Sequence, residues 1–135
     1  MINFSKFLPK RRSDTHKGDY GHVLVLAGSP GFTGAAYLCS QGSLISGSGL
    51  ITLGIPKSLN SIMAVKLTEV MTKLLPETES GTLSLRAYDE ILDFIDKVDV
   101  VAIGPGLSTH KETVRLVWRL ITSISKPIVI DADGL

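Results

Sequence analysis

The sequence predicts an α/β fold of three layers, in which a mostly parallel sheet lies between helices on both faces. Two observations lead to this fold class. Short aliphatic runs recur along the 135 residues, and segments with apolar side chains at helical spacing lie between them. Strands that alternate with helices favour a parallel sheet joined by right-handed crossovers. The length suits one domain with a sizeable core.

The first strand is expected at 23–27, where the chain consists only of Val, Leu and Ala. This composition is typical of a strand that is covered on both faces. Further strands are predicted at 50–55, 68–74, 98–103 and 128–130. The polar stretch 76–82 after the third strand is predicted to be an exposed connection.

The segment 34–47 is expected to be a helix with an unusually small inner side, which ends at the glycines 47 and 49. The small residues are Ala35, Ala36, Cys39, Gly42 and Ser46, and they alternate with Leu38 and Ile45. Small side chains allow a helix to approach a sheet or a ligand closely. Tight packing on the sheet explains most of these positions without a function.

Three more helices are expected further along the chain. One covers 57–65, with Ile62 and Met63 as inward candidates, and one covers 84–96 and packs one face on the sheet. In the last, at 109–123, Thr109 and Glu112 match the capping box that satisfies backbone N–H groups at a helix start. Its apolar side chains are predicted to form a core face: Val114, Val117, Trp118 and Ile121.

Composition narrows the class of protein. A formal net charge of +1 gives no general electrostatic footprint for nucleic acid, so we expect no nucleic-acid partner. Cys39 is the only cysteine, which rules out an internal disulfide, and no Cys/His spacing resembles a zinc site. No segment has the length and hydropathy of a membrane span or a secretory signal. A cytoplasmic protein without a membrane partner is the expectation.

Residues 1–16 form a basic leader, which we predict to be a solvated arm or a short helix. Its basic residues are Lys6, Lys10, Arg11, Arg12 and His16. Lys17 is treated separately, because it is expected to sit beside the glycine-rich turn that follows the first strand.

That glycine-rich turn spans 28–34. In open α/β sheets ligands bind at the carboxyl ends of strands, where the following helix presents free N–H groups. Two nucleotide motifs are excluded. Gly34 is followed by two alanines instead of the Lys and Ser/Thr of a P-loop. The glycine spacing at 28, 31 and 34 is not that of a dinucleotide fingerprint, and no acidic residue ends the second strand.

Two other predicted strands end in residues that could bind a ligand or take part in chemistry. The strand at 98–103 opens into Gly-Pro-Gly-Leu at 104–107, and the last strand ends in Asp131 and Asp133. The economical interpretation is one ligand cleft lined by all three strand ends. For the two carboxylates the alternatives are a ligand or metal contact, or a helix N-cap with a solvated neighbour.

Taken together, the motifs resemble the ADP- or ATP-dependent NAD(P)H-hydrate dehydratases. The motifs are Lys-Gly-Asp-Tyr-Gly-His at 17–22, Val-Leu-Val-Leu-Ala-Gly-Ser at 23–29, Gly-Ala-Ala at 34–36, Ile-Gly-Pro-Gly-Leu at 103–107 and Pro-Ile-Val-Ile-Asp-Ala-Asp-Gly-Leu at 127–135. The resemblance implies that 17–135 is the amino-terminal part of a single ribokinase-like domain, here truncated. It also implies a lyase that dehydrates NADHX and NADPHX to NADH and NADPH, with Mg²⁺ and with ADP or ATP as co-substrate, in a homo-oligomer.

The resemblance assigns roles to particular residues. Ala35 and Gly106 would contact the substrate, and Gly28 and Ser29 would line the same cleft. Asp131, Asp133 and Lys17 would lie near the phosphates or the metal. Family members are about twice as long, and a Gly-Thr-Gly-Asp-type segment in their second half supplies an anion hole and the catalytic aspartate. This sequence has no such segment, so no catalytic residue is expected in it.

Two alternatives stay open at this point. A ribokinase-like kinase of a small vitamin precursor would share the fold and differ in the second half. A non-catalytic half-domain that binds nucleotide or mediates oligomerisation would use the small-residue helix and the open edge of the last strand.

Overall fold

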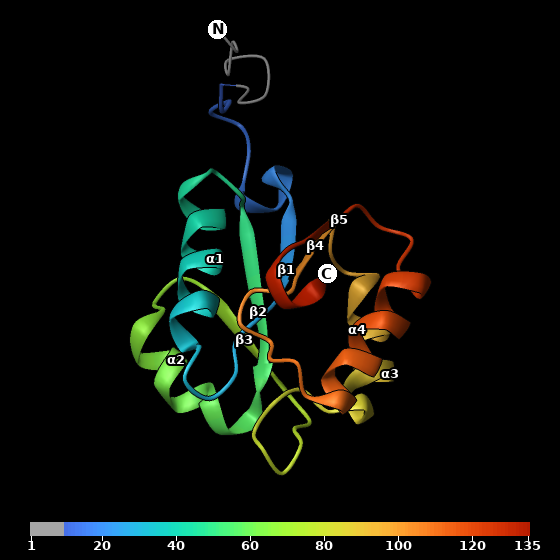
Figure 1. The fold of residues 1–135 in the computed structure, drawn as a ribbon. Helices are drawn as coiled ribbons and strands as arrows, with labels where there is room; N and C mark the ends of the chain where they lie inside the picture. The colour runs from blue at the N-terminus through green and yellow to red at the C-terminus, as the bar shows by residue number, and fades with distance from the viewer. Residues whose placement is uncertain (1–9) are drawn as a thin grey trace, which may run out of the picture.

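A computed structural model describes residues 10–135 and confirms the α/β class (Figure 1). Five strands form one sheet in the order β3-β2-β1-β4-β5, and every neighbouring pair is parallel. The strands are β1 (His22–Leu26), β2 (Leu50–Pro56), β3 (Met71–Leu75), β4 (Val100–Ile103) and β5 (Ile128–Ile130). The helices are α1 (Thr33–Ile45), α2 (Asn60–Lys66), α3 (Tyr88–Ile95) and α4 (Lys111–Ser123). Short 3-10 turns cover Lys17–Tyr20, Lys57–Leu59, Leu85–Ala87 and Ala132–Gly134.

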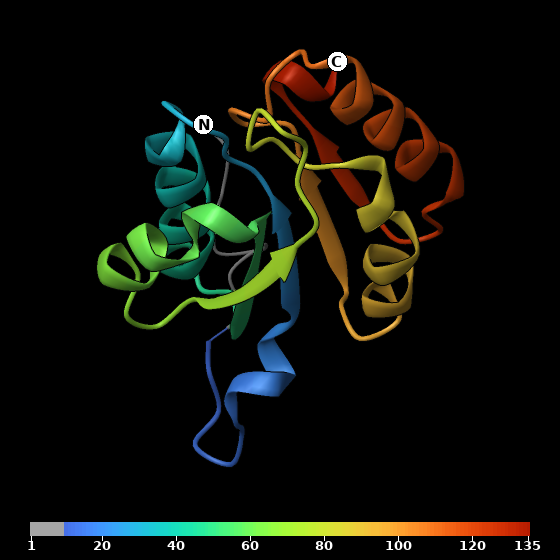
Figure 2. The ribbon, with the colours of Figure 1, turned by 90° about the horizontal axis from the view of Figure 1, so that it is seen from below.

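Helices cover both faces of the sheet, as Figure 2 shows. Leu24 and Leu26 of β1 belong to the apolar cluster under α3 and α4, whereas Val25 belongs to the cluster under α1 and α2. This division follows from the pleat, because successive side chains of a strand point to opposite faces. The uninterrupted apolar run of β1 is therefore buried on both sides, as its composition predicted.

Two predicted segments differ from the structure near β3. The strand expected at 68–74 begins only at Met71, because residues 68–70 bend so that Leu67 and Val70 join the core beside Met63. Met63 is fully buried as expected, but Ile62, the other inward candidate, is 45% exposed. α2 thus presents a single residue to the sheet where two were predicted.

The predicted core faces of two helices were partly wrong. In α1 the buried residues are Ala36 and Ser40, while Gly42 and Ser46 are exposed with Leu38 and Ile45. In α4 the buried residues are Thr113, Leu116, Val117 and Leu120. Trp118, predicted to lie in the core, is 67% exposed. α4 packs near the β5 edge of the sheet, and its inward face is rotated by about one residue from the predicted one.

The connection between β3 and α3 is not simply exposed, as the sequence suggested. It crosses from the α2 side of the sheet to the α3 side along the carboxyl ends of the strands (Figure 2). Glu77 accepts a hydrogen bond from the Ser58 N–H (2.9 Å), and a side chain at Gly81 would lie 2.9 Å from the ring of Pro30. Thr82 is buried at the end of this connection, and its Oγ1 accepts a hydrogen bond from Thr113 Oγ1 of α4 (2.9 Å).

Residues 17–21 lie at the amino end of β1, opposite to the glycine-rich turn. The carbonyl of Lys17 packs against Gly49, just before β2 begins, and Gly49 donates its N–H to Tyr20 O (3.1 Å). The strand β1 separates Lys17 from Gly28, so the expectation that Lys17 sits beside the glycine-rich turn was wrong. Its place before the strand in sequence puts it at the wrong end of the sheet.

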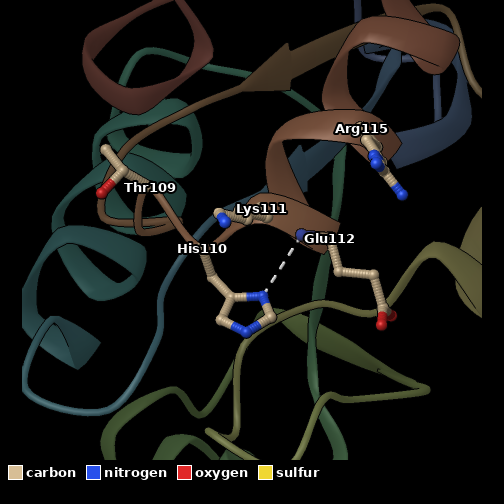
Figure 3. Close-up of a pocket in the computed structure, with 5 residues that line it drawn as sticks. All are labelled: Thr109, His110, Lys111, Glu112 and Arg115. Atoms are coloured by element: carbon tan, nitrogen blue, oxygen red, sulfur yellow. Dashed lines mark hydrogen bonds between the residues drawn. The ribbon is translucent and has the colours of Figure 1, made fainter.

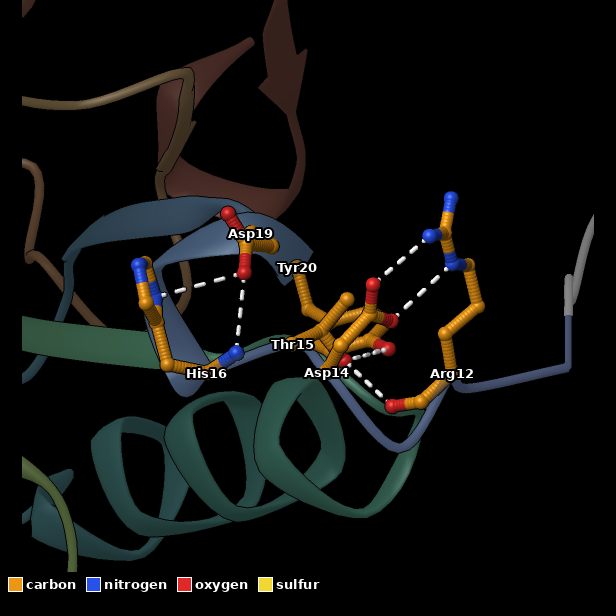
Figure 4. Close-up of polar contacts among 6 residues, drawn as sticks. All are labelled: Arg12, Asp14, Thr15, His16, Asp19 and Tyr20. Carbon is orange, nitrogen blue, oxygen red and sulfur yellow. Dashed lines mark hydrogen bonds and ion pairs between the residues drawn. The ribbon is translucent and has the colours of Figure 1, made fainter.

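The described part of the basic leader, 10–16, contacts the domain at this same end (Figure 4). Arg11 donates to Gly47 O (2.9 Å) and stacks over the Tyr20 ring, with the guanidinium carbon 4.4 Å from the ring centroid. Arg12 pairs with Asp14 (2.7 Å), and Thr15 shares a hydrogen bond with Tyr20 (2.6 Å). The rest of the predicted leader, with Lys6, falls on residues 1–9, outside the described residues.

Candidate functional site

The order of strands places a topological switch point between β1 and β4. From β1 the chain proceeds outward to β2 and β3, then returns to β4 on the other side of β1. Connections on the two sides run over opposite faces, and open α/β sheets of this kind bind ligands beyond the carboxyl ends of the two central strands. The two glycine turns predicted to carry chemistry follow these two strands.

Hydrogen bonds hold the two turns together. Gly28 donates its N–H to Pro105 O (2.9 Å), and Ser29 Oγ donates to Gly106 O (2.8 Å). Ser29 is only 1% exposed. It therefore fixes the second turn from its buried side.

The structure brings Ala35 and Gly106 together, the two residues to which the family resemblance assigned substrate contact. A Cβ atom at Gly106 would lie 2.9 Å from Ala35 Cβ and 2.8 Å from Phe32 Cβ. A Cβ atom at Gly28 would similarly lie 2.9 Å from Ala36 Cβ. Real Cβ contacts are longer than this, so the small residues allow the amino end of α1 to close onto both turns.

The end of β5 completes the arrangement. Gly104 packs on the carbonyl of Asp131, and Asp133 accepts a hydrogen bond from the Ser108 N–H (2.9 Å). Ser108 (φ 79°) and Ala132 (φ 49°) are the non-glycine residues of the described chain with positive φ. Strained backbone of this kind persists where the surrounding structure over-determines it, and it clusters at functional sites. The three strand ends thus meet, as the sequence predicted.

Cys39 of α1 lies near this region. Burial, and secondarily the negative charge of Asp131, raise the pKa of its thiol. A thiol with a raised pKa stays protonated near neutral pH, and the thiolate is the reactive form. Cys39 is therefore a packing residue, and nucleophilic chemistry is not assigned to it.

A hollow of about 500 Å³ lies at the amino end of α4, lined by Thr109, His110, Lys111, Glu112 and Arg115 (Figure 3). The predicted capping box is not formed there. His110 is the N-cap, and its Nδ1 accepts from the Glu112 N–H (3.3 Å). Glu112 instead accepts from Ser84 Oγ and from the Leu85 N–H (2.9 Å), which ties α4 to the start of α3.

These two hydrogen bonds, first the one from Ser84, lower the pKa of Glu112 below its usual value of 4.5. A carboxyl whose pKa is lower in the folded state stabilises the fold above its unfolded pKa, and the contribution is lost as the pH falls through the folded pKa.

We therefore expect Glu112→Gln to lower the thermal midpoint at pH 7 by a few degrees and to have a much smaller effect at pH 3. Thermal unfolding followed by circular dichroism at both pH values measures this. Glu79→Gln is the matched control, because Glu79 is exposed and its carboxylate bonds to no described residue. An equal loss at both pH values for Glu112→Gln would contradict the prediction.

The residues present do not form a Mg²⁺ site by themselves. Within residues 10–135 no group of three or more His, Cys, Asp or Glu side chains is arranged to hold a metal ion. Asp133 already accepts a backbone N–H, Asp131 is exposed, and Lys17 lies at the other end of the sheet. In nucleotide sites Mg²⁺ is held by one or two carboxylates together with waters and substrate phosphates, and this part of the chain does not gather enough protein ligands to hold the ion alone.

Within residues 10–135 the structure contains no helix that could span a bilayer.

Sequence reasoning missed two parts of this region. The crossing connection 76–84 borders the glycine turn through Gly81 and Pro30. Its polar composition predicted exposure, but the structure shows buried threonine hydrogen bonds there, which Thr113 of α4 joins. The switch point was missed because strand order, unlike strand number, has no local sequence pattern.

Comparison with known proteins gives a consistent picture. The sequence model of a family described as NAD(P)H-hydrate dehydratase matches residues 23–135. The bifunctional NAD(P)H-hydrate repair enzyme Nnr of Moorella thermoacetica is 48% identical over 128 residues, which are 95% of this chain and 24% of that protein.

Solved structures agree with the fold. The ADP/ATP-dependent NAD(P)H-hydrate dehydratase of Bacillus subtilis, co-crystallised with ATP and Mg²⁺, superimposes with a TM-score of 0.73 at 28% identity, over 94% of this chain and 42% of that one. A ribokinase-like protein of Enterococcus faecalis gives a TM-score of 0.77 at 20% identity over 93% and 41% of the two chains. The chain thus spans about a quarter of the length of its curated relatives and two fifths of these solved chains.

Proposed function

Since this chain belongs to the NAD(P)H-hydrate dehydratase family and has its ribokinase-like fold, we propose that it forms the substrate-binding amino-terminal part of a dehydratase domain. The complete domain would remove water from NADHX and NADPHX to regenerate NADH and NADPH. ADP or ATP would serve as co-substrate with Mg²⁺. Residues 17–135 would be the first part of that domain, and residues 1–16 its basic leader.

The observation that carries the proposal is the meeting of Ala35 and Gly106 at the switch point. Both belong to motifs that resemble the family, and both lie where open α/β sheets bind ligands. Gly28 and Gly106 are buried under the close contact with α1 and Ala35 is half-buried, so a flat ring would approach this wall of backbone and small side chains from the Ala35 side. In this assignment Ala35 and Gly106 contact the hydrated nicotinamide, Gly28 borders them, and Ser29 holds Gly106.

We further propose that catalysis requires a second polypeptide part, equivalent to the segment that lies after the matched region in the relatives. The partial coverage of those relatives supports this, as does the edge at β5. Asp131 donates to Ile103 O (3.1 Å), and Val101 donates to Pro127 O (3.0 Å). Because N–H groups alternate in direction along a strand, those of Ile128 and Ile130 point away from β4 and can pair with an added strand.

Apolar side chains flank this edge on both faces. Val129 is 58% and Trp118 67% exposed. A groove of about 250 Å³ beside the edge is lined by Trp118, Ile121, Thr122, Ile130, Gly134 and Leu135. A strand added to β5, with a helix packed over Trp118, would cover both surfaces.

The test is reconstitution. The 135-residue chain is expected to show no dehydration of NADHX with ADP or ATP and Mg²⁺, measured by the appearance of NADH. Addition of the polypeptide that lies after the matched region in the Moorella thermoacetica relative should restore turnover. Turnover by the chain alone would contradict the requirement for a second part. A complex that forms but never turns over would contradict the assigned reaction.

Substitutions at two residues with similar exposure identify the docking surface in the same assay. Trp118→Glu should weaken association by at least about tenfold, because large aromatic anchors dominate such interfaces. Leu38→Glu is the control, since Leu38 of α1 is 69% exposed and lies far from β5 in sequence and on another helix. Equal losses for both variants would place the docking surface elsewhere.

The kinase alternative gives a different result in this experiment. A solved relative from Bacillus subtilis, 26% identical, is described as a putative kinase, and this fold class is shared. Phosphorylation of a hydroxyethylthiazole or hydroxymethylpyrimidine by the reconstituted protein, without activity on NADHX, would favour that function. Binding of nucleotide or formation of an oligomer without either activity would favour the half-domain with a binding role.

A further inference from the structure

We propose that Asp133 is a positioning residue that holds the Gly104–Ser108 turn in its site conformation, and that it is not a ligand of the metal or the phosphates. The inference rests on the proposed function only in that this turn contains the predicted substrate contact Gly106. Its geometry and its test stand without any measurement of activity.

The first argument is the strained residue that Asp133 supports. Ser108 has a φ of 79°, in the left-handed region that non-glycine residues seldom adopt. Its N–H donates to Asp133 Oδ2 at 2.9 Å, across 25 residues of sequence. A hydrogen bond to a charged carboxylate is stronger than one between neutral groups, so this bond offsets part of the strain. Ser108 Oγ in turn accepts from the His110 N–H (3.3 Å), which continues the fixed geometry to the start of α4.

The second argument is that the turn is held from its other side as well. Ser29 Oγ donates to Gly106 O (2.8 Å), and Gly28 donates to Pro105 O (2.9 Å). Gly106 therefore lies between two side-chain hydrogen bonds, one from the end of β1 and one reaching Ser108 from the end of β5. Removal of either should free the turn on one side while the other remains.

The third argument concerns what Asp133 lacks for the alternative role. A Mg²⁺ ion in near-octahedral geometry takes one or two carboxylates, waters and substrate phosphates, so its protein ligands need carboxylate oxygens that are free of other partners. Residues 10–135 gather no group of three potential ligands. One oxygen of Asp133 is already committed to a backbone N–H, and Asp131 is exposed two residues away. The contacts of Asp133 therefore suit a residue that supports the turn better than a metal ligand.

Amide hydrogen exchange of Ser108 in the 135-residue chain, measured by ¹⁵N NMR, tests the proposal. Asp133→Ala should accelerate exchange by about tenfold, the factor expected for loss of one charge-assisted hydrogen bond. Asp133→Asn should retain most of the protection, because an amide oxygen accepts the same N–H while binding Mg²⁺ poorly. Asp131→Ala is the matched control and should leave exchange of Ser108 unchanged.

A MgCl₂ titration of the wild-type chain provides the opposing measurement. Mg²⁺ should cause no shift of the Ser108 or Asp133 resonances that depends on the Asp133 carboxylate. A shift that is seen in the wild-type chain and lost in Asp133→Asn would overturn the proposal. Loss of protection in Asp133→Asn equal to that in Asp133→Ala would overturn it too. Failure of NADHX turnover, by contrast, would affect only the proposed function.

If Asp133→Ala does not fold, the strain itself gives a second measurement. Ser108→Gly removes the penalty for positive φ but keeps the backbone N–H that donates to Asp133. Asp133→Ala in this relaxed background should again accelerate exchange of the residue-108 amide by about tenfold, which supports the positioning role. Unchanged exchange at residue 108 would contradict it.

Discussion

Gly104→Ala is expected to lower the free energy of unfolding by about 3 kcal/mol or more, because it combines backbone strain with overpacking. Gly104 has a φ of 130°, which an L side chain rarely adopts. A Cβ atom there would lie 1.7 Å from Asp131 O and 2.8 Å from Gly134 N. Both atoms belong to backbone, and the Asp131 N–H is bonded to Ile103 O (3.1 Å), so they cannot move aside without breaking the β4–β5 pairing.

Urea unfolding followed by circular dichroism measures the loss. Gly31→Ala is the control for strain alone, since Gly31 also has positive φ (85°) but nothing lies within 4 Å of its added Cβ. It should cost about 1–2 kcal/mol. If Gly104→Ala costs no more than Gly31→Ala, the close contact between the turns after β4 and β5 is contradicted.

The convergence of three strand ends was predictable because it depends on topology that the sequence encodes repeatedly. Each apolar run followed by a turn marks a carboxyl end, and parallel strands bring all such ends to one edge of the sheet. The same reasoning shows why Lys17 was misplaced. Lys17 precedes its strand, and five residues of extended chain span roughly 16 Å, so proximity in sequence to the glycine turn did not mean proximity in space.

The face of α4 was mispredicted for a different reason. Helical spacing defines several overlapping stripes, and Val117 belongs to both the predicted stripe and the observed one. The choice between Trp118 and Leu116 as the inward neighbour depends on where α4 crosses the sheet, which no local pattern contains. The observed choice leaves Trp118 beside the β5 edge, where it lines the proposed docking groove.

The sequence predicted which residues gather at the site, but it did not predict the contacts that each of them makes. Ser29 was expected to line the cleft and Asp133 to lie near the phosphates or the metal, and both stay predictions; the structure shows that their hydrogen bonds go to the Gly104–Ser108 turn. Sequence marks a polar residue next to a turn, but it does not distinguish one that faces a ligand from one that supports the turn. The atoms to which the polar side chain bonds, and the burial of that side chain, distinguish the two cases.

The other large effect is expected at the opposite end of the sheet. Gly49→Ala should lower the free energy of unfolding by about 2–3 kcal/mol through overpacking alone. An added Cβ would lie 1.6 Å from Lys17 O and 3.2 Å from Tyr20 Cβ. Gly49 is held in place by its bond to Tyr20 O (3.1 Å) and by that of Leu50 to Gly21 O (3.0 Å), so relief of the clash must displace the Lys17–Tyr20 turn.

Gly42→Ala is the matched control for this substitution, because Gly42 lies in the last turn of α1 and nothing lies within 4 Å of its added Cβ. It should raise stability by up to about 1 kcal/mol through helix propensity. The urea experiment should be combined with exchange of the Ser108 amide, which lies at the other end of the strands. If Gly49→Ala destabilises the chain yet leaves Ser108 protected under native conditions, the Lys17–His22 motif stabilises the fold from its amino end. An altered environment at Ser108 would instead show that this motif acts on the site through the sheet.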